Sequence, residues 1–550
     1  IHTLSLHDAL PISSLAAIEV HASNSAFRSV EGVLFNKTQT KLLAFPGGRE
    51  GAYTVPTSAT SIEIGAFYGC ARLASLTVPR NVTAIRTGAF GGCTGLTSVA
   101  LSERLTKIEA GLFEGCVNLA GVTIPGTVTL IGNGAFRACT GLTAITIPNA
   151  DTKIEDGAFE DCANLAGVTL GTKVASIGQS AFARCASLTA ITIPNTVTKI
   201  GDGAFEDCAS LASVTLGTKV ASIGRSAFAR CTSLTGITIP NTVTSLGNEV
   251  FEDCVNLASV TLGTKVASIG RYAFCRCTSL TGITIPKSVT SIQAWAFWDC
   301  TSLINVAIPN SVTSIGDEAF EGCTSLTSVS IPSSITAIGV AVFYQCSSLT
   351  SVTIPESVTR IGAYAFYGCS SLPAITIPSR VTSIGPYAFC RCTSLTAITI
   401  PSRVTSIGRY AFYACTSLVD ATIGTRVASI GTYAFGSCTA LPAITIPAGV
   451  ASIDPWVFSD CTSLTSVTIP DSVTRIGDGA LSGCTSLTRI ILPAKVTRIG
   501  AYAFGGCTGL ASVCFLGNAP AAAYAFADCP ATVYYMAGST GWCTRSDYNT

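Results

Sequence analysis

The cysteines set a single period along almost the whole chain. From Cys70 to Cys507, twenty cysteines follow one another at intervals of 23 residues without an insertion or deletion, and Cys529 follows after 22. A sustained repeat of this length is typical of a solenoid, in which each repeat forms one coil. Length alone would divide a chain of 550 residues into several independent domains. The repeat therefore favours one continuous architecture over several separate cores.

Each repeat follows the pattern C-x-x-L-x-x-[VI]-x-[ILV]-[PG]-x-x-[VIL]-x-x-I-[GE]-x-x-A-F-x-x-C, with a few departures. Leu stands three residues after the cysteine in all twenty coils, and Phe stands three residues before it in nineteen, Leu481 being the exception. β-Branched residues that alternate and end at Pro or Gly predict a short strand. The spacing of Ala, Phe and Cys after the glycine predicts one buried side of a helical turn.

One coil is too small to fold alone. Its apolar side chains, about eight, contribute roughly 15 kcal/mol on burial, whereas ordering a coil costs about 35 kcal/mol of conformational entropy. Stacking on neighbouring coils must supply the difference. The sequence thus predicts an α/β solenoid: a right-handed superhelix of about 21 coils, with a parallel sheet on one face and short helical turns on the other.

The charge and hydropathy of the chain exclude two classes of partner. Only 11% of residues are charged and the net charge is +1, so the chain as a whole has no long-range field to attract nucleic acid or an anionic membrane. Pro, Gly, Thr or a charged residue interrupts every apolar stretch before it reaches the length of a membrane span. We therefore predict neither nucleic-acid binding nor membrane insertion for this region.

The two ends differ from the repeats. The stretch TLSLHDALPI (Thr3–Ile12) matches the conceptual translation of a common sequencing adapter, so residues 1–13 are interpreted as a non-native scar. The chain starts without Met, and we expect that its native N-terminus is missing. The predicted domains are an atypical N-terminal repeat with a hairpin insertion over residues 14–58, the solenoid over residues 59–529 and a C-terminal cap over residues 530–550. A truncated cap is kept as an alternative.

The L-x-x-[VI]-x-[IL] strand, the 23-residue unit and the I-G-x-x-A-F-x-x-C tail resemble the BspA-type leucine-rich repeats, also called the Treponema pallidum type. The resemblance covers Ala59–Cys529. Val30–Gly48 is similar to the hairpin insertion of the family's N-terminal repeats, and Ala531–Trp542 is similar to its C-terminal cap. The resemblance implies an extracellular or cell-surface protein that adheres to host matrix proteins or to other cells, and it implies no catalytic site.

The repeated cysteines are interpreted as a structural ladder, because a free cysteine behaves as a small buried hydrophobe. Disulfides along the ladder are disfavoured, since equivalent cysteines have parallel Cα–Cβ vectors about 4.8 Å apart. Cys275 and Cys390 lie outside the series. They occupy equivalent positions five coils apart, which is too far for both to bind one metal ion. Cys275 is expected to be partly exposed and reactive. We predict no metal and no cofactor. The ladder is represented by Cys185, Cys208, Cys231, Cys254 and Cys277.

The residue before the ladder cysteine alternates in charge within a 46-residue duplication. We predict that these alternating residues form an ion-pair ladder on the surface, and the alternative is that they bind a partner. Each pair is expected to stabilise the fold by about 0 to 1 kcal/mol. Paired carboxylates such as Glu160 and Asp161 recur with the same period, which argues against a glycosidase site. The charge ladder comprises Asp161, Arg184, Asp207, Arg230, Asp253, Arg276 and Asp299.

Catalysis by a nucleophile and a histidine is disfavoured as well. Outside residues 1–13 the one histidine is His21, which precedes the regular coils, so no Ser-His-Asp or Cys-His pair can form within them. We therefore predict a non-enzymatic protein.

Aromatic residues are the candidate partner-binding positions. Many stand five residues before a ladder cysteine, and some have a second aromatic residue three positions on, on the same predicted turn. Exposed Tyr and Trp are enriched where proteins bind partners. The alternative, that the aromatic ladder only packs against itself, is equally open. These residues are Trp295, Trp298, Tyr364, Tyr367, Tyr387, Tyr410, Tyr413, Tyr433, Trp456 and Tyr502.

Taken with the resemblance, these features favour a recognition or adhesion protein that binds proteins or glycans through an extended repeat surface. One alternative is a structural spacer or surface-layer element. A second is the recognition region of a larger, truncated enzyme.

Overall fold

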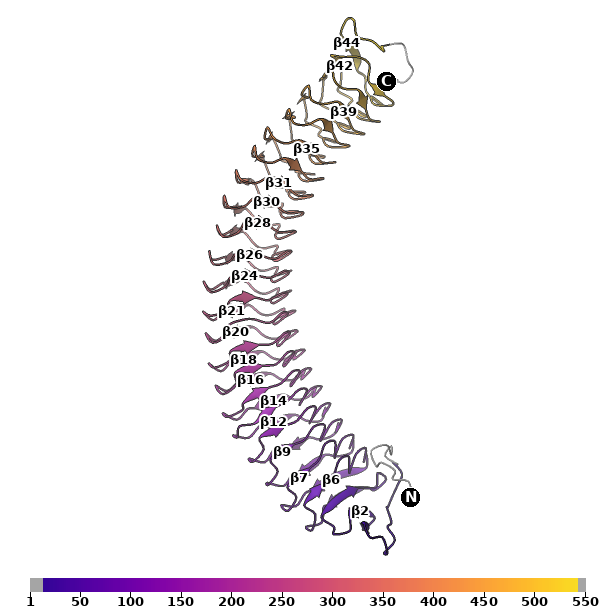
Figure 1. Ribbon diagram of the computed structural model, residues 1–550, viewed down its shortest axis with the longest axis vertical. Helices are drawn as coiled ribbons and strands as arrows, with labels where there is room; N and C mark the ends of the chain where they lie inside the picture. The colour runs from indigo at the N-terminus through magenta and orange to yellow at the C-terminus, as the bar shows by residue number, and fades with distance from the viewer. Residues whose placement is uncertain (1–12, 543–550) are drawn as a thin grey trace. The chain divides into compact units, whose positions relative to one another are not determined.

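The computed structural model describes residues 13–542, and the residues interpreted as a scar lie outside this range except for Ser13. The chain divides into two compact units, Ile1–Ser279 and Leu280–Thr550. Within each unit the coils stack one on the next, and each coil contributes strands to parallel ladders (Figure 1). The prediction of a parallel solenoid with a 23-residue period is confirmed.

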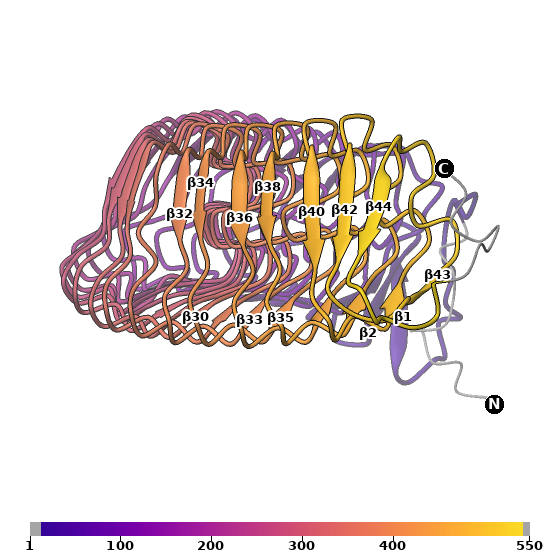
Figure 2. The same ribbon diagram turned by 90° about the horizontal axis from the view of Figure 1, so that it is seen from above.

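The first ladder holds the predicted strand of each coil. Equivalent residues pair across 23 positions: Ala190 opposes Ser213 and Ile191 opposes Val214. In the first unit its strands are β4 (Gly51–Thr54), β6 (Leu73–Thr77), β8 (Ser98–Ala100), β10 (Gly121–Val122), β12 (Ala144–Thr146), β14 (Gly167–Thr169), β16 (Ala190–Thr192), β18 (Ser213–Thr215), β20 (Gly236–Thr238) and β21 (Ser259–Thr261). In the second unit they are β23 (Gly282–Thr284), β25 (Asn305–Ala307), β27 (Ser328–Ser330), β29 (Ser351–Thr353), β32 (Ala397–Thr399), β34 (Asp420–Thr422), β36 (Ala443–Thr445), β38 (Ser466–Thr468), β40 (Arg489–Leu492), β42 (Ser512–Phe515) and β44 (Thr532–Tyr535). The last seven lie side by side in Figure 2.

A second parallel ladder, which was not predicted, runs along another side of each unit. Its strands have only two residues and in most coils end at the isoleucine of the I-[GE] pair, as in Lys199–Ile200 opposite Ser222–Ile223. In the first unit they are β5 (Ser61–Ile62), β7 (Ala84–Ile85), β9 (Lys107–Ile108), β11 (Leu130–Ile131), β13 (Lys153–Ile154), β15 (Ser176–Ile177), β17 (Lys199–Ile200), β19 (Ser222–Ile223) and β22 (Ser268–Ile269). In the second unit they are β24 (Ser291–Ile292), β26 (Ser314–Ile315), β28 (Ala337–Ile338), β30 (Arg360–Ile361), β31 (Ser383–Ile384), β33 (Ser406–Ile407), β35 (Ser429–Ile430), β37 (Ser452–Ile453), β39 (Arg475–Ile476), β41 (Arg498–Ile499) and β43 (Ala521–Ala522).

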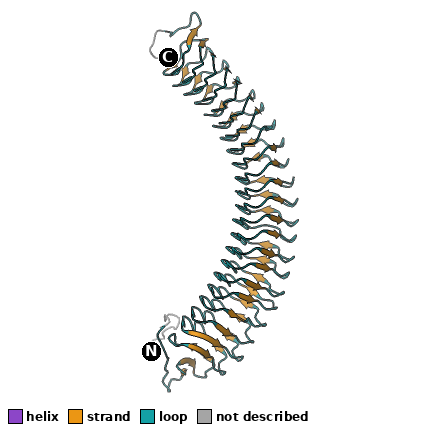
Figure 3. Ribbon diagram, turned by 180° about the vertical axis from the view of Figure 1, so that it is seen from behind, coloured by secondary structure: helices purple, strands orange, loops and turns teal. Residues whose placement is uncertain are grey.

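The prediction of short helical turns is wrong. Residues 13–542 contain strands, turns and loops and no helix (Figure 3). Between Gly157 and Cys162 the backbone amides alternate between two kinds of acceptor. Gly157, Phe159 and Asp161 donate to carbonyls of the next coil at 2.8 to 2.9 Å, whereas the residues between them donate three positions back. An α-helix needs bonds four positions back, so the contacts between coils replace the helix.

Two residues in this turn adopt the left-handed conformation in most coils. They stand five positions and one position before the ladder cysteine, as Glu249 (φ 59°) and Asp253 (φ 56°) do before Cys254. Glycine occupies these positions in several coils, but elsewhere a side chain does. The left-handed conformation destabilises a non-glycine residue by about 1 kcal/mol or more. It is nevertheless repeated from coil to coil, because hydrogen bonds to the next coil fix the backbone there.

Replacing Ala138 (φ 57°) by Gly is therefore expected to raise the free energy of unfolding by about 0.5 kcal/mol, because relief of the left-handed strain exceeds the added entropy of the unfolded chain. The urea midpoint measures the effect. The control is Ala135→Gly in the same turn, where the buried methyl group is lost and no positive φ is relieved; it should destabilise. Equal destabilisation by both variants would contradict the argument.

The core of each unit is built from files of identical side chains. Along the first ladder the middle residue is buried and its neighbours are exposed, as for Ile191 between Ala190 and Thr192. The phenylalanines are fully buried and their rings stack from coil to coil, with centroids 5.4 Å apart for Phe182 and Phe205 and an interplanar angle of 2°. Each buried position thus continues through the stack, which is how coils too small to fold alone share one core.

Antiparallel strands cover the first coils. β1 (Phe27–Val30) and β2 (Val33–Asn36) form a hairpin, and β3 (Lys41–Ala44) pairs antiparallel with β2 and parallel with β5. The turn between β1 and β2 has positive φ at Glu31 and Gly32, as a two-residue hairpin requires. The antiparallel pair of β2 and β3 lies in the segment that resembles the family's N-terminal insertion. The boundaries proposed at residues 14–58, 59–529 and 530–550 remain predictions.

Candidate functional site

The ladder cysteines are hydrogen-bond donors in the core. In most coils the thiol donates to the phenylalanine carbonyl of the preceding coil, at 3.2 Å in coils such as those of Cys185, Cys208 and Cys231. Cys208 and Cys254 are fully buried, and burial raises the pKa of each thiol to about 12. A thiol is nucleophilic only as the thiolate. These cysteines are therefore protonated at neutral pH and act as structural donors rather than reactive groups.

The expectation that Cys275 is partly exposed is wrong. Its exposed fraction is 1%, and that of Cys390 is 2%. Both occupy the position two residues before the ladder cysteine, where small side chains such as Ala229 are also buried. Exposure at this position depends on the size of the side chain, because larger groups such as Trp298 reach the surface there. Burial raises the pKa of Cys390 to about 11, which gives no sign of reactivity.

The charge ladder of the first unit consists of ion-pair clusters that link neighbouring coils. Arg184 Nε lies 2.5 Å from Asp161 Oδ1, and its Nη2 lies 2.6 Å from Glu160 Oε1. Arg230 contacts Asp207 and Glu206 in the same way. The hydrogen bond from Arg184 holds the pKa of Asp161 below its usual range. Asp161 is thus held as an anion beside a guanidinium and is not poised to act as a general acid.

The remaining members of this file lie at its C-terminal end. Arg276 Nη1 lies 3.6 Å from Asp253 Oδ1, and Asp299 belongs to the second unit. The side chains of the pairs are partly exposed, so water screens them and each pair is worth about 0 to 1 kcal/mol. Whether the charge ladder also binds a partner remains a prediction.

The aromatic residues of the second unit form a continuous stack on the turn side of the coils. Tyr364, Tyr387, Tyr410, Tyr433 and Trp456 are nearly parallel, with successive ring centroids 4.7, 4.7, 4.8 and 5.8 Å apart. All five are half-buried. Their ring faces are covered by one another, so only ring edges and the tyrosine hydroxyls reach the surface. A partner could contact these edges but could not insert between the rings.

The stack ends for a steric reason. Trp456 lies over Gly479, where an added Cβ would collide with the indole ring. Tyr502, one coil beyond, is 51% exposed. Near the other end of the unit, Trp295 donates from its indole nitrogen to Glu318 Oε2 at 2.6 Å, and Trp298 is half-buried. These three residues therefore stand apart from the five-ring stack.

A second, shorter row lies beside the stack, and the prediction included only part of it. Tyr367 stacks on Tyr344 with centroids 4.7 Å apart, and Tyr413 meets Tyr410 edge to face at 5.4 Å. The guanidinium of Arg391 lies over the Tyr367 ring, 5.9 Å from its centroid. Tyr344 could have been recognised from the sequence, because it stands 23 residues before Tyr367 in the same position of the repeat.

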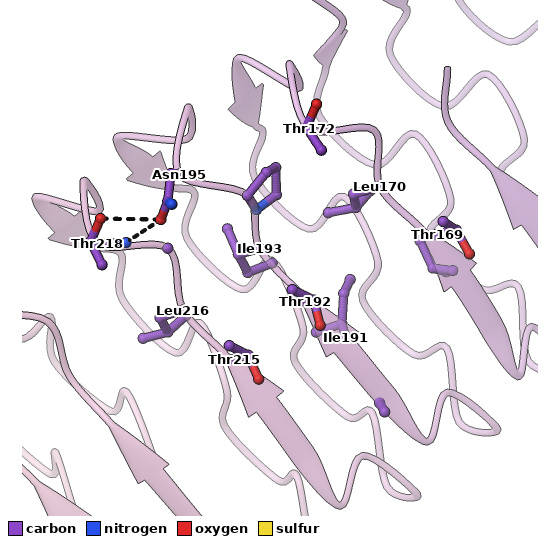
Figure 4. A pocket seen from close by; sticks show the side chains of 14 residues that line it. Thr169, Leu170, Thr172, Ile191, Thr192, Ile193, Asn195, Thr215, Leu216 and Thr218 are labelled. Carbon is purple, nitrogen blue, oxygen red and sulfur yellow. Dashed lines mark hydrogen bonds between the residues drawn. The ribbon is translucent and has the colours of Figure 1, made fainter. Parts of the chain in front are cut away.

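The first ladder carries shallow depressions between its exposed threonines. One of them, of about 760 Å³, spans three coils around Thr169, Thr192 and Thr215 (Figure 4). At its edge Asn195 Oδ1 accepts hydrogen bonds from the amide and hydroxyl of Thr218 at 2.7 and 3.1 Å. None of the residues that line it is titratable. The depression offers hydroxyl and apolar contacts but no group for acid–base or nucleophilic chemistry.

Two further features concern the described residues as a whole. Over residues 13–542 no three His, Cys, Asp or Glu side chains are grouped so that they could hold a metal ion. In the same range no helix is present that could span a membrane.

The repeated coil, with its parallel ladder and its file of buried leucines, defines the leucine-rich repeat class. The sequence profile of the BspA type leucine rich repeat region (6 copies) matches residues 60–189, 175–304, 247–373, 299–419 and 405–533. The chain belongs to this family, as the resemblance predicted. Proteins of this family and fold are generally non-catalytic, and no enzyme family is indicated.

Solved structures of similar proteins show how far the likeness extends. A leucine-rich repeat protein from Bacteroides ovatus is 23% identical, with 86% of this chain and 95% of that chain covered and a TM-score of 0.34. A leucine rich cell surface protein from Faecalibacterium prausnitzii is 28% identical, with 73% and 96% covered and a TM-score of 0.37. A T. pallidum leucine rich repeat protein is 30% identical, with 34% and 78% covered and a TM-score of 0.27. Among curated proteins no match is found.

Proposed function

We propose that the chain is a non-enzymatic recognition or adhesion protein of the cell surface or extracellular space, which binds matrix or cell-surface proteins or glycans. Its family supports a protein-interaction scaffold, and the similar Faecalibacterium prausnitzii protein is described as a cell surface protein. The observation that carries the proposal is the row of aromatic edges from Tyr364 to Trp456, which are half-exposed although their faces are stacked.

The geometry of the stack supports contact through hydroxyls and ring edges. Burial raises the pKa of Tyr387, Tyr410 and Tyr433, so their hydroxyls are neutral donors at physiological pH. Tyrosine is favoured at interfaces because it offers an apolar body and a hydrogen-bonding tip with little entropy to lose. A stack fixed from coil to coil would present four such tyrosine tips in one line, followed by Trp456.

Two triple variants separate binding from packing. Y387A/Y410A/Y433A removes the rings and should lower the melting temperature by several degrees, since each aromatic pair contributes about 0.5 to 1.5 kcal/mol. Y387F/Y410F/Y433F keeps the stack and removes only the hydroxyls, so it should melt like the parent chain.

Binding is measured on an array of matrix proteins and glycans. We expect both variants to lose at least tenfold in affinity for any partner that the parent chain captures. If the alanine variant melts earlier and both variants still bind like the parent, the stack has only a packing role, and the spacer interpretation replaces the proposal.

A further inference from the structure

A row of three arginines runs along the second unit on consecutive coils. Arg380, Arg403 and Arg426 each stand three residues before the second-ladder serines Ser383, Ser406 and Ser429, which pair in register. Equivalent positions of paired parallel strands lie about 4.8 Å apart. All three arginines are exposed. We call them the arginine row.

The arginines of the row form no ion pair in the part of the chain that the structure describes. Within the described range, no ion pair, hydrogen bond or ring contact joins these three side chains to another group. Glu356, on the coil before Arg380, accepts hydrogen bonds from the amide and hydroxyl of Ser379. From Ser370 to Ala451 the chain holds five arginines and one acidic residue, Asp420. This segment is therefore basic although the net charge of the whole chain is near zero.

Stability does not account for this row. Like charges stacked from coil to coil repel one another, and the first unit avoids that repulsion by alternating Asp and Arg in its charge ladder. Other coils place Ser or Thr at the same position, where the hydroxyl donates to a carbonyl of the preceding coil. Ser357 Oγ lies 2.6 Å from the Ile335 carbonyl and Ser472 Oγ lies 2.7 Å from that of Val450. The three arginines give up this bond.

We propose that the arginine row binds an acidic polysaccharide, one whose sugars carry carboxylate or sulfate groups at regular intervals. Guanidinium groups form bidentate hydrogen bonds with planar or tetrahedral oxyanions, and a row with the spacing of the coils matches an extended chain with repeated charges. This inference rests on the proposed function and names the class of partner.

The residues beside the row favour a sugar chain over a nucleic acid. Ser379, Ser402 and Thr425 precede the arginines and are exposed, so hydroxyl groups flank the row. On its other side Thr382 and Thr405 donate to carbonyls of the preceding coil, which leaves their oxygens free to accept hydrogen bonds from sugar hydroxyls. No aromatic side chain lies among these flanking residues, whereas single-stranded nucleic acids are bound by stacking their bases on aromatic groups.

The test compares two triple variants of the whole chain. R380S/R403S/R426S introduces the residue that Ser357 and Ser472 already supply at this position, so the coil should keep its fold. K173S/K219S/K265S is the matched control, because it removes three cations from the same position of the repeat in the first unit, where they occur on alternate coils. Circular dichroism and thermal melting verify that both variants are folded.

The probes are heparin, which carries sulfate, polygalacturonate, which carries only carboxylate, neutral dextran, and single- and double-stranded DNA oligonucleotides. We expect the parent chain to bind heparin or polygalacturonate at least tenfold more tightly than dextran or DNA, and the preferred probe identifies the oxyanion. The arginine variant should lose at least tenfold in affinity, and the slope of log Kd against log salt should fall by about 2 to 3, since each cation that neutralises an anion displaces about one counterion. The lysine variant should stay within twofold of the parent.

Three outcomes would overturn the inference: equal loss in both variants, no loss in the arginine variant, or tighter binding of DNA than of either acidic polysaccharide. If the chain captures a protein through its tyrosines and ignores both polysaccharides, this inference fails while the proposed function stands. If the chain binds polysaccharide through the arginine row and the tyrosine variants bind with the affinity of the parent, the proposed contact through the aromatic stack is wrong and this inference stands.

Discussion

Raising the pH from about 8 to about 11 is expected to unfold the first unit of the solenoid through its cysteines. Burial raises the pKa of Cys116, Cys162, Cys208 and Cys254 to about 12, whereas an unfolded thiol titrates near 8.5. The folded state therefore binds more protons than the unfolded state between these two values. The stability from the buried neutral thiols is fully present below about pH 8.5 and is lost as the pH rises toward 12.

The expected effect is large because the cysteines repeat. Each thiol contributes a slope of about 1.4 kcal/mol per pH unit in this window. The four thiols together give about 5 kcal/mol per unit, which is comparable to the whole stability of an ordinary domain. The measurement is the urea midpoint from circular dichroism at several pH values between 7 and 10, together with thiolate absorbance near 240 nm.

The control replaces the four cysteines by serine, which keeps a donor to the phenylalanine carbonyl but does not titrate in this range. We expect C116S/C162S/C208S/C254S to be less stable at neutral pH and to lose stability less steeply above pH 9. Thiolate absorbance with a midpoint near pH 8.5 in a chain whose circular dichroism is unchanged would mean that the thiols are accessible in the folded state, and the buried ladder would be disproved.

Replacing Phe205 by Ala is expected to lower the free energy of unfolding locally by about 3 to 5 kcal/mol. The ring is fully buried and stacks on Phe182 at 5.4 Å and on Phe228 at 5.3 Å. Its removal leaves a cavity and interrupts the file from both sides. Because each coil contacts only its neighbours, the damage should stay near these coils instead of spreading through the unit.

Hydrogen exchange measures this effect residue by residue. The amides of Phe182 and Phe205 donate to carbonyls of the next coil at 2.8 Å, and we expect their protection to fall while that of distant coils is kept. The control is Phe205→Leu, chosen because Leu481 fills the same position of the repeat and is fully buried there; its cost should be about 1 kcal/mol. Loss of protection spread evenly over the unit would show that the coils do not act as nearest neighbours.

The turn segment between the glycine and the ladder cysteine was predicted correctly in its side chains but not in its backbone. The spacing of Ala, Phe and Cys correctly identified the buried side chains, since all three are buried in coils such as Ala204–Cys208. It did not predict their backbone, because the same spacing suits a helical turn and a bend whose alternate amides bond to the next coil. The second ladder was missed for a related reason: strands of two residues are too short to show a period.

The candidate sites show the same limit. The positions of the aromatic row and of the charge ladder followed from the repeat, but their contacts did not. The sequence could not show that Arg184 reaches back to Glu160 and Asp161, that the faces of the tyrosine rings are covered, or that Cys275 is buried. Each of these depends on the sizes and directions of side chains on neighbouring coils.

The sequence by itself determined the period, the main buried files of Leu, Ile, Phe and Cys, and hence the solenoid. An uninterrupted 23-residue repeat places equivalent residues in register, and a single coil cannot bury enough apolar surface alone. Only the tertiary structure decided where the backbone hydrogen bonds go and which surfaces stay open to a partner. Those outcomes arise from competition between bonds within a coil and bonds to the next one, and that competition depends on contacts between coils that a linear pattern does not contain.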